Sequence, residues 1–132
     1  MILQFEVPGP ARGQGRPRFS RRGGYVRTYT DPKDTAYARA VQVEALAAKP
    51  RGWEPLTGPV RLTITVYQKV SKRSAKGASY SVTRPDLDNV LKAILDALSG
   101  IAFHDDRQVA VIEAEKRLSD RPRVYVTVQG IG

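Results

Sequence analysis

The stretch of sequence that determines the fold is Asp86-Leu87-Asp88-Asn89-Val90-Leu91-Lys92-Ala93-Ile94-Leu95-Asp96-Ala97-Leu98-Ser99-Gly100. With about 100° of rotation per residue, the apolar side chains fall within one sector of a helix. They are Leu87, Val90, Leu91, Ile94, Leu95 and Leu98. The opposite sector holds Asp88, Asn89, Lys92 and Asp96. The pattern predicts an amphipathic helix from about Asp86 to Ser99, ended by Gly100. Its apolar face must pack on a sheet, because no other segment of the chain would bury it.

Strands on both sides of this helix supply the predicted sheet. Alternation of apolar and polar residues predicts strands over residues 3–7, 60–67, 108–118 and 123–128. A first helix is expected to start at Thr30-Asp31-Pro32 and to stop near Pro50. A short hairpin that turns at Gly23-Gly24 is expected within residues 19–29. This order of elements predicts an α+β fold, with a small mixed β-sheet and two main helices packed on it. No domain boundary is visible, so residues 1–132 are expected to form a single domain.

The composition excludes several kinds of protein. The chain has 132 residues, of which 41% are hydrophobic, so a packed domain is expected rather than a disordered chain. It contains no cysteine, so it forms no disulfide and no thiolate metal site. No stretch approaches the roughly 18 apolar residues that a membrane helix needs, and the N-terminus is unlike a signal peptide. We therefore expect a cytoplasmic protein of a bacterial or phage-infected cell, with no membrane partner and no small-molecule cofactor.

The positive charge is concentrated in two segments. The chain carries 22 lysines and arginines against 13 acidic residues, a net charge of +9. Residues 8–30 and residues 68–84 contain basic residues and no acid, and both are rich in glycine and serine. Such clusters indicate a nucleic-acid partner, although a merely basic, solvated surface is the alternative. The candidate DNA-binding residues are Arg16, Arg18, Arg21, Arg22, Lys69, Lys72, Arg73 and Lys76.

Two acidic blocks interrupt this basic chain. One is Asp86 with Asp88 at the start of the predicted helix, and the other is Asp105-Asp106 at the mouth of the strand that follows. Each block alone has a structural explanation, since aspartate caps helices and occupies turns. If the blocks converge, three or four carboxylates share one small volume, and like charges that close require a cation. Oxygen ligands without cysteine favour Mg²⁺, or Mn²⁺ as its substitute, and such ions serve phosphoryl chemistry.

Lys92 follows Asp88 by four residues on the same predicted helix face. Its ammonium either pairs with Asp88 or Asp96 along the helix or lies near a scissile phosphate, and the spacing alone favours neither. His104 is the one histidine of the chain. Beside the acidic doublet it is expected to be a polar loop residue rather than a catalytic group.

Three motifs follow one another in the second half of the chain. They are Arg84-Pro85-Asp86-Leu87-Asp88-Asn89-Val90-Leu91-Lys92, Asp96-Ala97-Leu98 and Asp105-Asp106-Arg107-Gln108-Val109. In spacing and residue type they resemble the RusA family of Holliday-junction resolvases. Two earlier segments resemble N-terminal features of the family's phage and prophage branch, and these are Gly15-Arg16-Pro17-Arg18 and Tyr29-Thr30-Asp31-Pro32.

The resemblance implies a homodimeric, Mg²⁺-dependent endodeoxyribonuclease of DNA recombination and repair. Its substrate would be four-way junction DNA, resolved by paired symmetric nicks. The implied catalytic and metal-binding carboxylates are Asp86, Asp88 and Asp106, with Asp105 as a further metal candidate and Lys92 as the catalytic cation. Two other functions stay open. One is a non-catalytic basic nucleic-acid-binding module whose acids are caps and turn residues, and the other is a nuclease acting on branched or flap DNA in general.

Overall fold

The fold is known from a computed structural model. It describes the chain except residues 16–17, 23–24, 30, 73 and 75, and the side chains of residues 16–30 also lie outside the description. The strands are β1 (Ile2–Pro8), β2 (Arg18–Arg22), β3 (Tyr25–Tyr29), β4 (Val60–Lys69), β5 (Val109–Ser119) and β6 (Arg123–Gly130). The helices are α1 (Pro32–Ala48), α2 (Leu87–Leu98) and the short 3-10 helix η1 (Asp106–Gln108).

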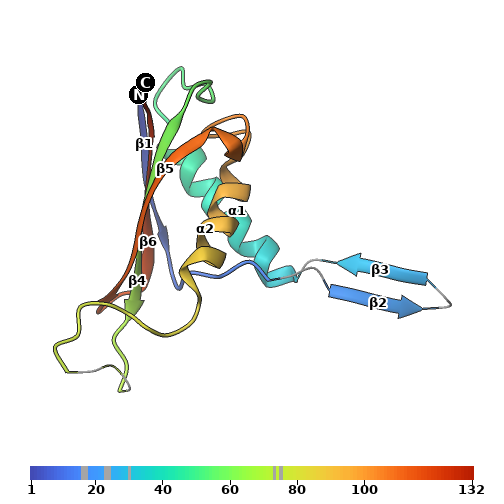
Figure 1. The fold of residues 1–132 in the computed structure, drawn as a ribbon, viewed down its shortest axis with the longest axis vertical. Coiled ribbons are helices and arrows are strands. Elements are labelled where there is room, and N and C mark those ends of the chain that lie inside the picture. Colours follow the sequence, from blue (N-terminus) through green and yellow to red (C-terminus); the bar gives the residue numbers. More distant parts are fainter. Residues whose placement is uncertain (16–17, 23–24, 30, 73, 75) are drawn as a thin grey trace.

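Four of the described strands form one mixed sheet in the order β1-β6-β4-β5 (Figure 1). β6 pairs antiparallel with both β1 and β4, whereas β5 pairs parallel with β4. A parallel neighbour has to be reached by a crossover connection, and α2 supplies it between β4 and β5. The two ends of α2 therefore lie toward opposite ends of the sheet. β5 is an edge strand.

Both α-helices cover the same face of the sheet, as Figure 1 shows. Alternate strand residues point to this face and are buried. They are Leu3, Phe5, Val7, Val60, Leu62, Ile64, Val66, Val124, Val126 and Val128. α2 adds Val90, Ile94 and Leu98 to the core, and α1 adds Val41 and Ala45. The apolar face predicted for residues 86–99 thus packs on the sheet, and this burial is the main favourable contribution to the stability of the fold.

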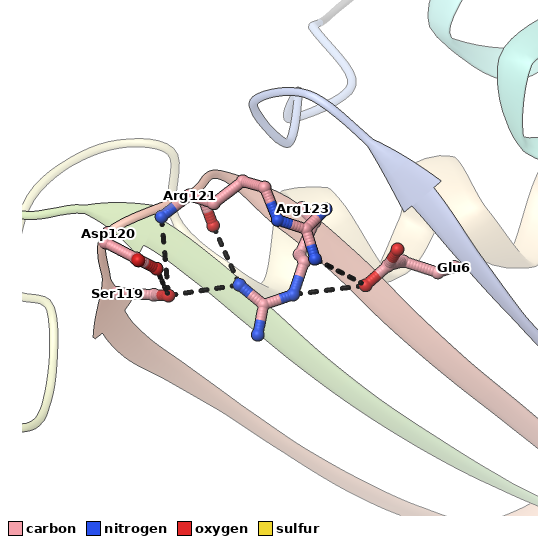
Figure 2. A network of polar contacts seen from close by, with 5 residues as sticks. All are labelled: Glu6, Ser119, Asp120, Arg121 and Arg123. Carbon is pink, nitrogen blue, oxygen red and sulfur yellow. Dashed lines mark hydrogen bonds and ion pairs between the residues drawn. The ribbon is translucent and has the colours of Figure 1, made fainter.

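The opposite face of the sheet is polar and includes a network around Arg123 of β6 (Figure 2). Arg123 Nε lies 3.1 Å from Glu6 Oε1, and Nη1 donates to Ser119 Oγ at 3.0 Å and to the Arg121 carbonyl oxygen at 2.9 Å. The guanidinium carbon lies 3.8 Å from the centroid of the Tyr67 ring. One side chain thereby joins β1, β4 and the turn between β5 and β6 through charge-assisted hydrogen bonds and a cation–π contact.

The predicted α+β class and order of elements are confirmed. β2 and β3 form the expected hairpin as a separate two-stranded sheet, while its predicted turn at Gly23-Gly24 lies outside the described residues. Asp31 caps α1 as predicted, because its side chain accepts from the Lys33 backbone N–H at 2.8 Å. Gly100 follows α2 with a φ of +90°, a conformation that favours glycine. No helix within the described ranges is long and apolar enough to cross a membrane.

Candidate active site at the two ends of helix α2

The first acidic block lies at the start of α2. Asp86 precedes the helix and Asp88 lies in its first turn, where the positive end of the helix dipole stabilises a carboxylate. Among the described residues, Asp86 makes no side-chain capping bond, so the capping role considered from the sequence is not observed. Asp88 Oδ1 accepts a hydrogen bond from the Asn89 backbone N–H at 3.0 Å. Both aspartates are exposed and accessible to a ligand.

The backbone leading into Asp86 is held by two side chains that the sequence analysis missed. Lys116 Nζ of β5 donates to the Thr83 carbonyl oxygen at 2.6 Å and to the Pro85 carbonyl oxygen at 3.1 Å. Gln68 Nε2 of β4 donates to the Arg84 carbonyl oxygen at 2.7 Å. Lys116 pairs with the buried Val66 of β4, so it occupies a strand position that faces the helices. A lysine at such a position was the feature of the sequence that could have revealed this structural role.

A glycine-rich segment, residues 11–15, packs against the same end of α2. The Gln14 backbone N–H donates to the Asn89 carbonyl oxygen at 3.1 Å. Gly13 packs so closely that an added Cβ would lie 3.0 Å from Asn89 Cβ. Between this segment and the helix start lies an open pocket, whose lining includes Arg84 and Asp86. Arg84 is exposed and makes no side-chain hydrogen bond or ion pair with any described residue, so its guanidinium is accessible to a phosphate.

The second acidic block lies at η1, just before β5. Asp105 Oδ1 accepts from the Arg107 backbone N–H at 2.9 Å, while Gln108 Oε1 accepts from the Asp105 backbone N–H at 3.0 Å. These reciprocal bonds form a capping box, so Asp105 has the structural role that the sequence left open. The bond from Arg107 lowers the pKa of Asp105 below its usual value of 3.8. Asp106 is exposed in the first turn of η1.

The two acidic blocks do not meet within one chain. α2 has 12 residues, which gives a length of about 18 Å between its ends. The Pro85 carbonyl oxygen, next to Asp86, accepts a hydrogen bond from Lys116 Nζ of β5. Lys116 lies seven residues along β5 from Val109, the first residue of the strand after η1 with Asp106. Seven strand residues span roughly 23 Å. Throughout the described part of the chain, no group of three or more histidines or carboxylates could hold a metal ion. The convergence of the blocks, which the sequence left open, is therefore not found within one chain, and one chain alone does not fit a Mg²⁺ site.

The basic candidates are only partly described. Lys92 Nζ lies 4.0 Å from Asp96 Oδ2, and no pair with Asp88 is seen among the described residues, so the structural alternative for Lys92 involves Asp96. Exposed lysines of the second basic segment are Lys69, Lys72 and Lys76. The side chains of Arg18, Arg21 and Arg22, and the whole of Arg16 and Arg73, lie outside the described residues.

These features place the chain among small basic α+β proteins whose exposed carboxylates flank one helix, a combination suited to phosphodiester chemistry. A family model described as Endodeoxyribonuclease RusA matches residues 8–129. The chain belongs to the RusA endodeoxyribonuclease family, and the predicted family is confirmed.

Two relatives extend along nearly the whole chain. The uncharacterized protein YqaN of Bacillus subtilis (strain 168) is 33% identical over 139 aligned residues, which cover 98% of this chain and 96% of the relative. A protein of Lactococcus phage r1t, named crossover junction endodeoxyribonuclease rusA, is 23% identical over 127 residues, covering 96% of this chain and 95% of the relative. Both relatives therefore match this chain over nearly their full length.

Proposed function

We propose that this protein is a divalent-metal-dependent, structure-selective endodeoxyribonuclease that resolves Holliday junctions by paired symmetric nicks. The observation that carries the proposal is family membership over residues 8–129, together with exposed acidic blocks at both ends of the helix that contains the family motif. The relative from phage r1t supports it by its name as a crossover junction endodeoxyribonuclease. Mg²⁺, with Mn²⁺ as a substitute, is the proposed cofactor.

The proposed catalytic residues are Asp86, Asp88, Asp106 and Lys92. The carboxylates would hold the cation, which supplies charge stabilisation for a phosphoryl group and orients an attacking water. Because one chain alone does not fit such a site, no step is assigned to the ion. The contribution of Lys92 would be electrostatic, since an ammonium on the same helix face as Asp88 lies where a phosphate approaching that carboxylate would pass.

The proposed DNA contacts are the two basic segments. Lys69, Lys72 and Lys76 are exposed, and Arg84, two residues before Asp86, adds an exposed guanidinium that pairs with no described residue. Contacts of this kind neutralise phosphates and release counterions, so affinity should fall steeply as salt increases. Arg16, Arg18, Arg21, Arg22 and Arg73 are proposed as further contacts. A chain with a net charge of +9 would be drawn to DNA of any shape. Shape selectivity is therefore assigned to a homodimer, whose two-fold symmetry would match a four-way junction.

A nicking assay on four-way, Y-shaped and linear DNA in Mg²⁺ tests the proposal. The wild-type protein should nick the four-way junction in opposed strands and leave linear duplex intact. Asp88→Asn should bind the junction normally and nick it at least about 100-fold more slowly, since even outer partners of metal ligands cost 10–100-fold. Asp120→Asn, in the exposed turn between β5 and β6, is the control and should behave as wild type. Normal nicking by Asp88→Asn would overturn the assignment.

The same assay distinguishes the second candidate function, a non-catalytic nucleic-acid-binding module. Two observations favour this alternative: Asp105 is a structural cap, and the described carboxylates do not converge within a chain. It predicts salt-sensitive binding with no cleavage in Mg²⁺ or Mn²⁺. Equal cleavage of Y-shaped and four-way DNA would instead indicate a general branched or flap nuclease.

A further inference from the structure

The basic hairpin of β2 and β3 is joined to the rest of the chain through a clamp, which consists of Arg12, Gly15, Asp31 and Asp34. Arg12 Nε forms an ion pair with Asp34 Oδ1, and Arg12 Nη2 lies 3.4 Å from Asp31 Oδ2. The Gly15 backbone N–H donates to Asp34 Oδ2 at 3.2 Å. Gly15 is the last described residue before the hairpin and Asp31 is the first one after it. The clamp therefore ties together the two segments that lead into and out of the hairpin.

The acids of the clamp lie beside a segment that is otherwise suited to DNA. Residues 8–30 contain no acid, and a carboxylate beside a DNA-binding segment repels phosphates. Asp34 nevertheless lies there with 9% of its side chain exposed, and its two oxygens accept from Arg12 and from Gly15. Arg12 in turn is engaged by two carboxylates, so its guanidinium is not free for a phosphate. These contacts indicate a role in holding the segment rather than in binding DNA.

The clamped segment, residues 12–15, also contacts the helix that carries the proposed catalytic residues. The Gln14 backbone N–H donates to the Asn89 carbonyl oxygen at 3.1 Å. Gly13 lies so close that an added Cβ would be 3.0 Å from Asn89 Cβ. Asn89 directly follows Asp88. One short segment thus connects the hairpin, the start of α1 and the start of α2.

We infer that Arg12 and Asp34 are positioning residues, which align the basic hairpin with the start of α2 and so determine which phosphate of the bound DNA is nicked. The inference rests on the proposed function, in which the hairpin holds the DNA backbone while Asp86 and Asp88 act on it. Neither Arg12 nor Asp34 would touch the DNA.

The dimensions of the hairpin make its alignment important. Figure 1 shows β2 and β3 beyond the start of α1, away from the four-stranded sheet. Each strand has five residues and is about 17 Å long, so a rotation of about 10° at the clamp would move the far end by about 3 Å. Successive phosphates of one DNA strand are about 3.4 Å apart along the duplex axis. A small rotation would therefore bring a neighbouring phosphate to the catalytic residues.

Asp34→Asn tests the clamp without changing the size of the side chain. The amide oxygen can still accept from the Gly15 N–H, but it offers no charge to Arg12. Junction products are separated at single-nucleotide resolution, and the wild-type protein should nick one phosphate in each of two opposed strands. The variant should nick that phosphate about 10- to 100-fold more slowly, as small misplacements do, and should also nick neighbouring phosphates. Asp120→Asn is the control and should keep the wild-type pattern. A wild-type rate and position of nicking in Asp34→Asn would overturn the inference.

Binding measurements separate positioning from direct contact with DNA. Arg12→Gln should leave the junction affinity and its salt dependence unchanged in the absence of a metal ion, because Arg12 is already paired with carboxylates. Lys69→Gln, at an exposed position proposed to contact DNA, should lower the slope of log affinity against log salt by about one. The same change of slope in Arg12→Gln would make Arg12 a phosphate contact and refute its positioning role. So would a loss of affinity as large as the loss of nicking.

A double variant tests whether the two residues act through each other. Arg12→Gln and Asp34→Asn remove the same ion pair, so the double variant should nick no more slowly than the slower single variant. Losses that multiply would show separate roles and contradict the inference. Circular dichroism and urea denaturation confirm that each variant is folded under the conditions of the assay.

The motion of the hairpin can be followed without any nicking. The chain has no cysteine, so Ser20→Cys provides a single site for a fluorescent label in β2. The anisotropy of the label should fall when Asp34→Asn or Arg12→Gln is added and stay unchanged with Asp120→Asn. Unchanged anisotropy in both clamp variants would exclude the clamp. If the hairpin loosens as expected but the wild-type protein nicks no DNA, the proposed function fails while the hold on the hairpin stands. If all variants nick at the wild-type phosphate, the inference fails and the proposed function stands.

Discussion

Replacing Gly13 with alanine tests how tightly the glycine segment is docked beside Asp86. Gly13 does not have a positive φ, so alanine is compatible with its backbone. The added Cβ would lie 3.0 Å from Asn89 Cβ and 3.3 Å from Pro85 Cβ. These separations are below the roughly 3.5–4.0 Å at which carbon atoms attract. Neither atom is the end of a flexible side chain, because Asn89 Cβ is attached to the helix backbone and Pro85 Cβ belongs to the proline ring. The segment itself must therefore move.

We expect Gly13→Ala to lower the free energy of unfolding by about 1–2 kcal/mol, since overpacking costs about 1–3 kcal/mol and a less flexible unfolded chain returns about 0.4–1 kcal/mol. Gly58→Ala is the matched control, because no atom lies within 4 Å of its Cβ position and its φ is not positive. It should be neutral or stabilising by up to about 1 kcal/mol. Urea denaturation followed by the fluorescence of Trp53, the single tryptophan, measures both variants.

The displacement should also slow nicking, because Gln14 is bonded to the Asn89 backbone one helical turn from Asp86. We expect Gly13→Ala to nick four-way junctions about 10- to 100-fold more slowly, as misplacements of this size do in other active sites, and Gly58→Ala to nick normally. Equal stability of the two glycine variants would refute the packing argument. A destabilised Gly13→Ala protein with a normal nicking rate would exclude the segment from the site.

Three further substitutions test other contacts. Lys116→Met should destabilise the protein by about 1–3 kcal/mol, the usual range for hydrogen bonds from a charged group, and should slow nicking. The control Lys49→Met, at an exposed position, should change stability by less than about 0.5 kcal/mol. Equal denaturation midpoints of the two variants would contradict a stabilising role for the bonds from Lys116 to the Thr83 and Pro85 carbonyl oxygens. Burial raises the pKa of Tyr37 to about 12 from 10.0, so its contribution to stability is complete below pH 10 and is lost as pH rises through 12, by about 2–3 kcal/mol. Tyr37→Phe should therefore lose less stability than wild type between pH 10 and 12 in denaturant titrations, and parallel losses would disprove the assignment. Arg123→Met should lower the unfolding free energy by about 1–3 kcal/mol through loss of its bonds to Glu6 and the β5–β6 turn, leaving nicking unchanged, and a wild-type melting temperature would count against the network.

The elements with a strong periodic signal were predictable from the sequence. α2 and β4 carry unbroken apolar patterns, and the structure buries core residues of both. An apolar pattern does not show that a polar residue among the helix-facing positions has a structural role. Lys116, opposite Val66, is such a residue. Its bonds to the Thr83 and Pro85 carbonyl oxygens depend on the path of residues 70–86, which no periodicity reports. Asp86 illustrates a similar limit, because it occupies the N-cap position of α2 as expected but its side chain makes no capping hydrogen bond, which depends on local geometry that residue type only favours.

The separation of the two acidic blocks shows that segments close in the sequence need not be close in space. α2 spans about 18 Å, and the seven residues from Ser99 to Asp105 could cover about 23 Å when extended, so a return of the doublet to Asp86 was compatible with the sequence. The chain instead turns tightly, because the Gly100 backbone N–H donates to the Phe103 carbonyl oxygen at 2.7 Å. Phe103 is completely buried and anchors this turn at the end of α2. The doublet is therefore held beside the end of α2, on the far side of the helix from Asp86 and Asp88 at its start.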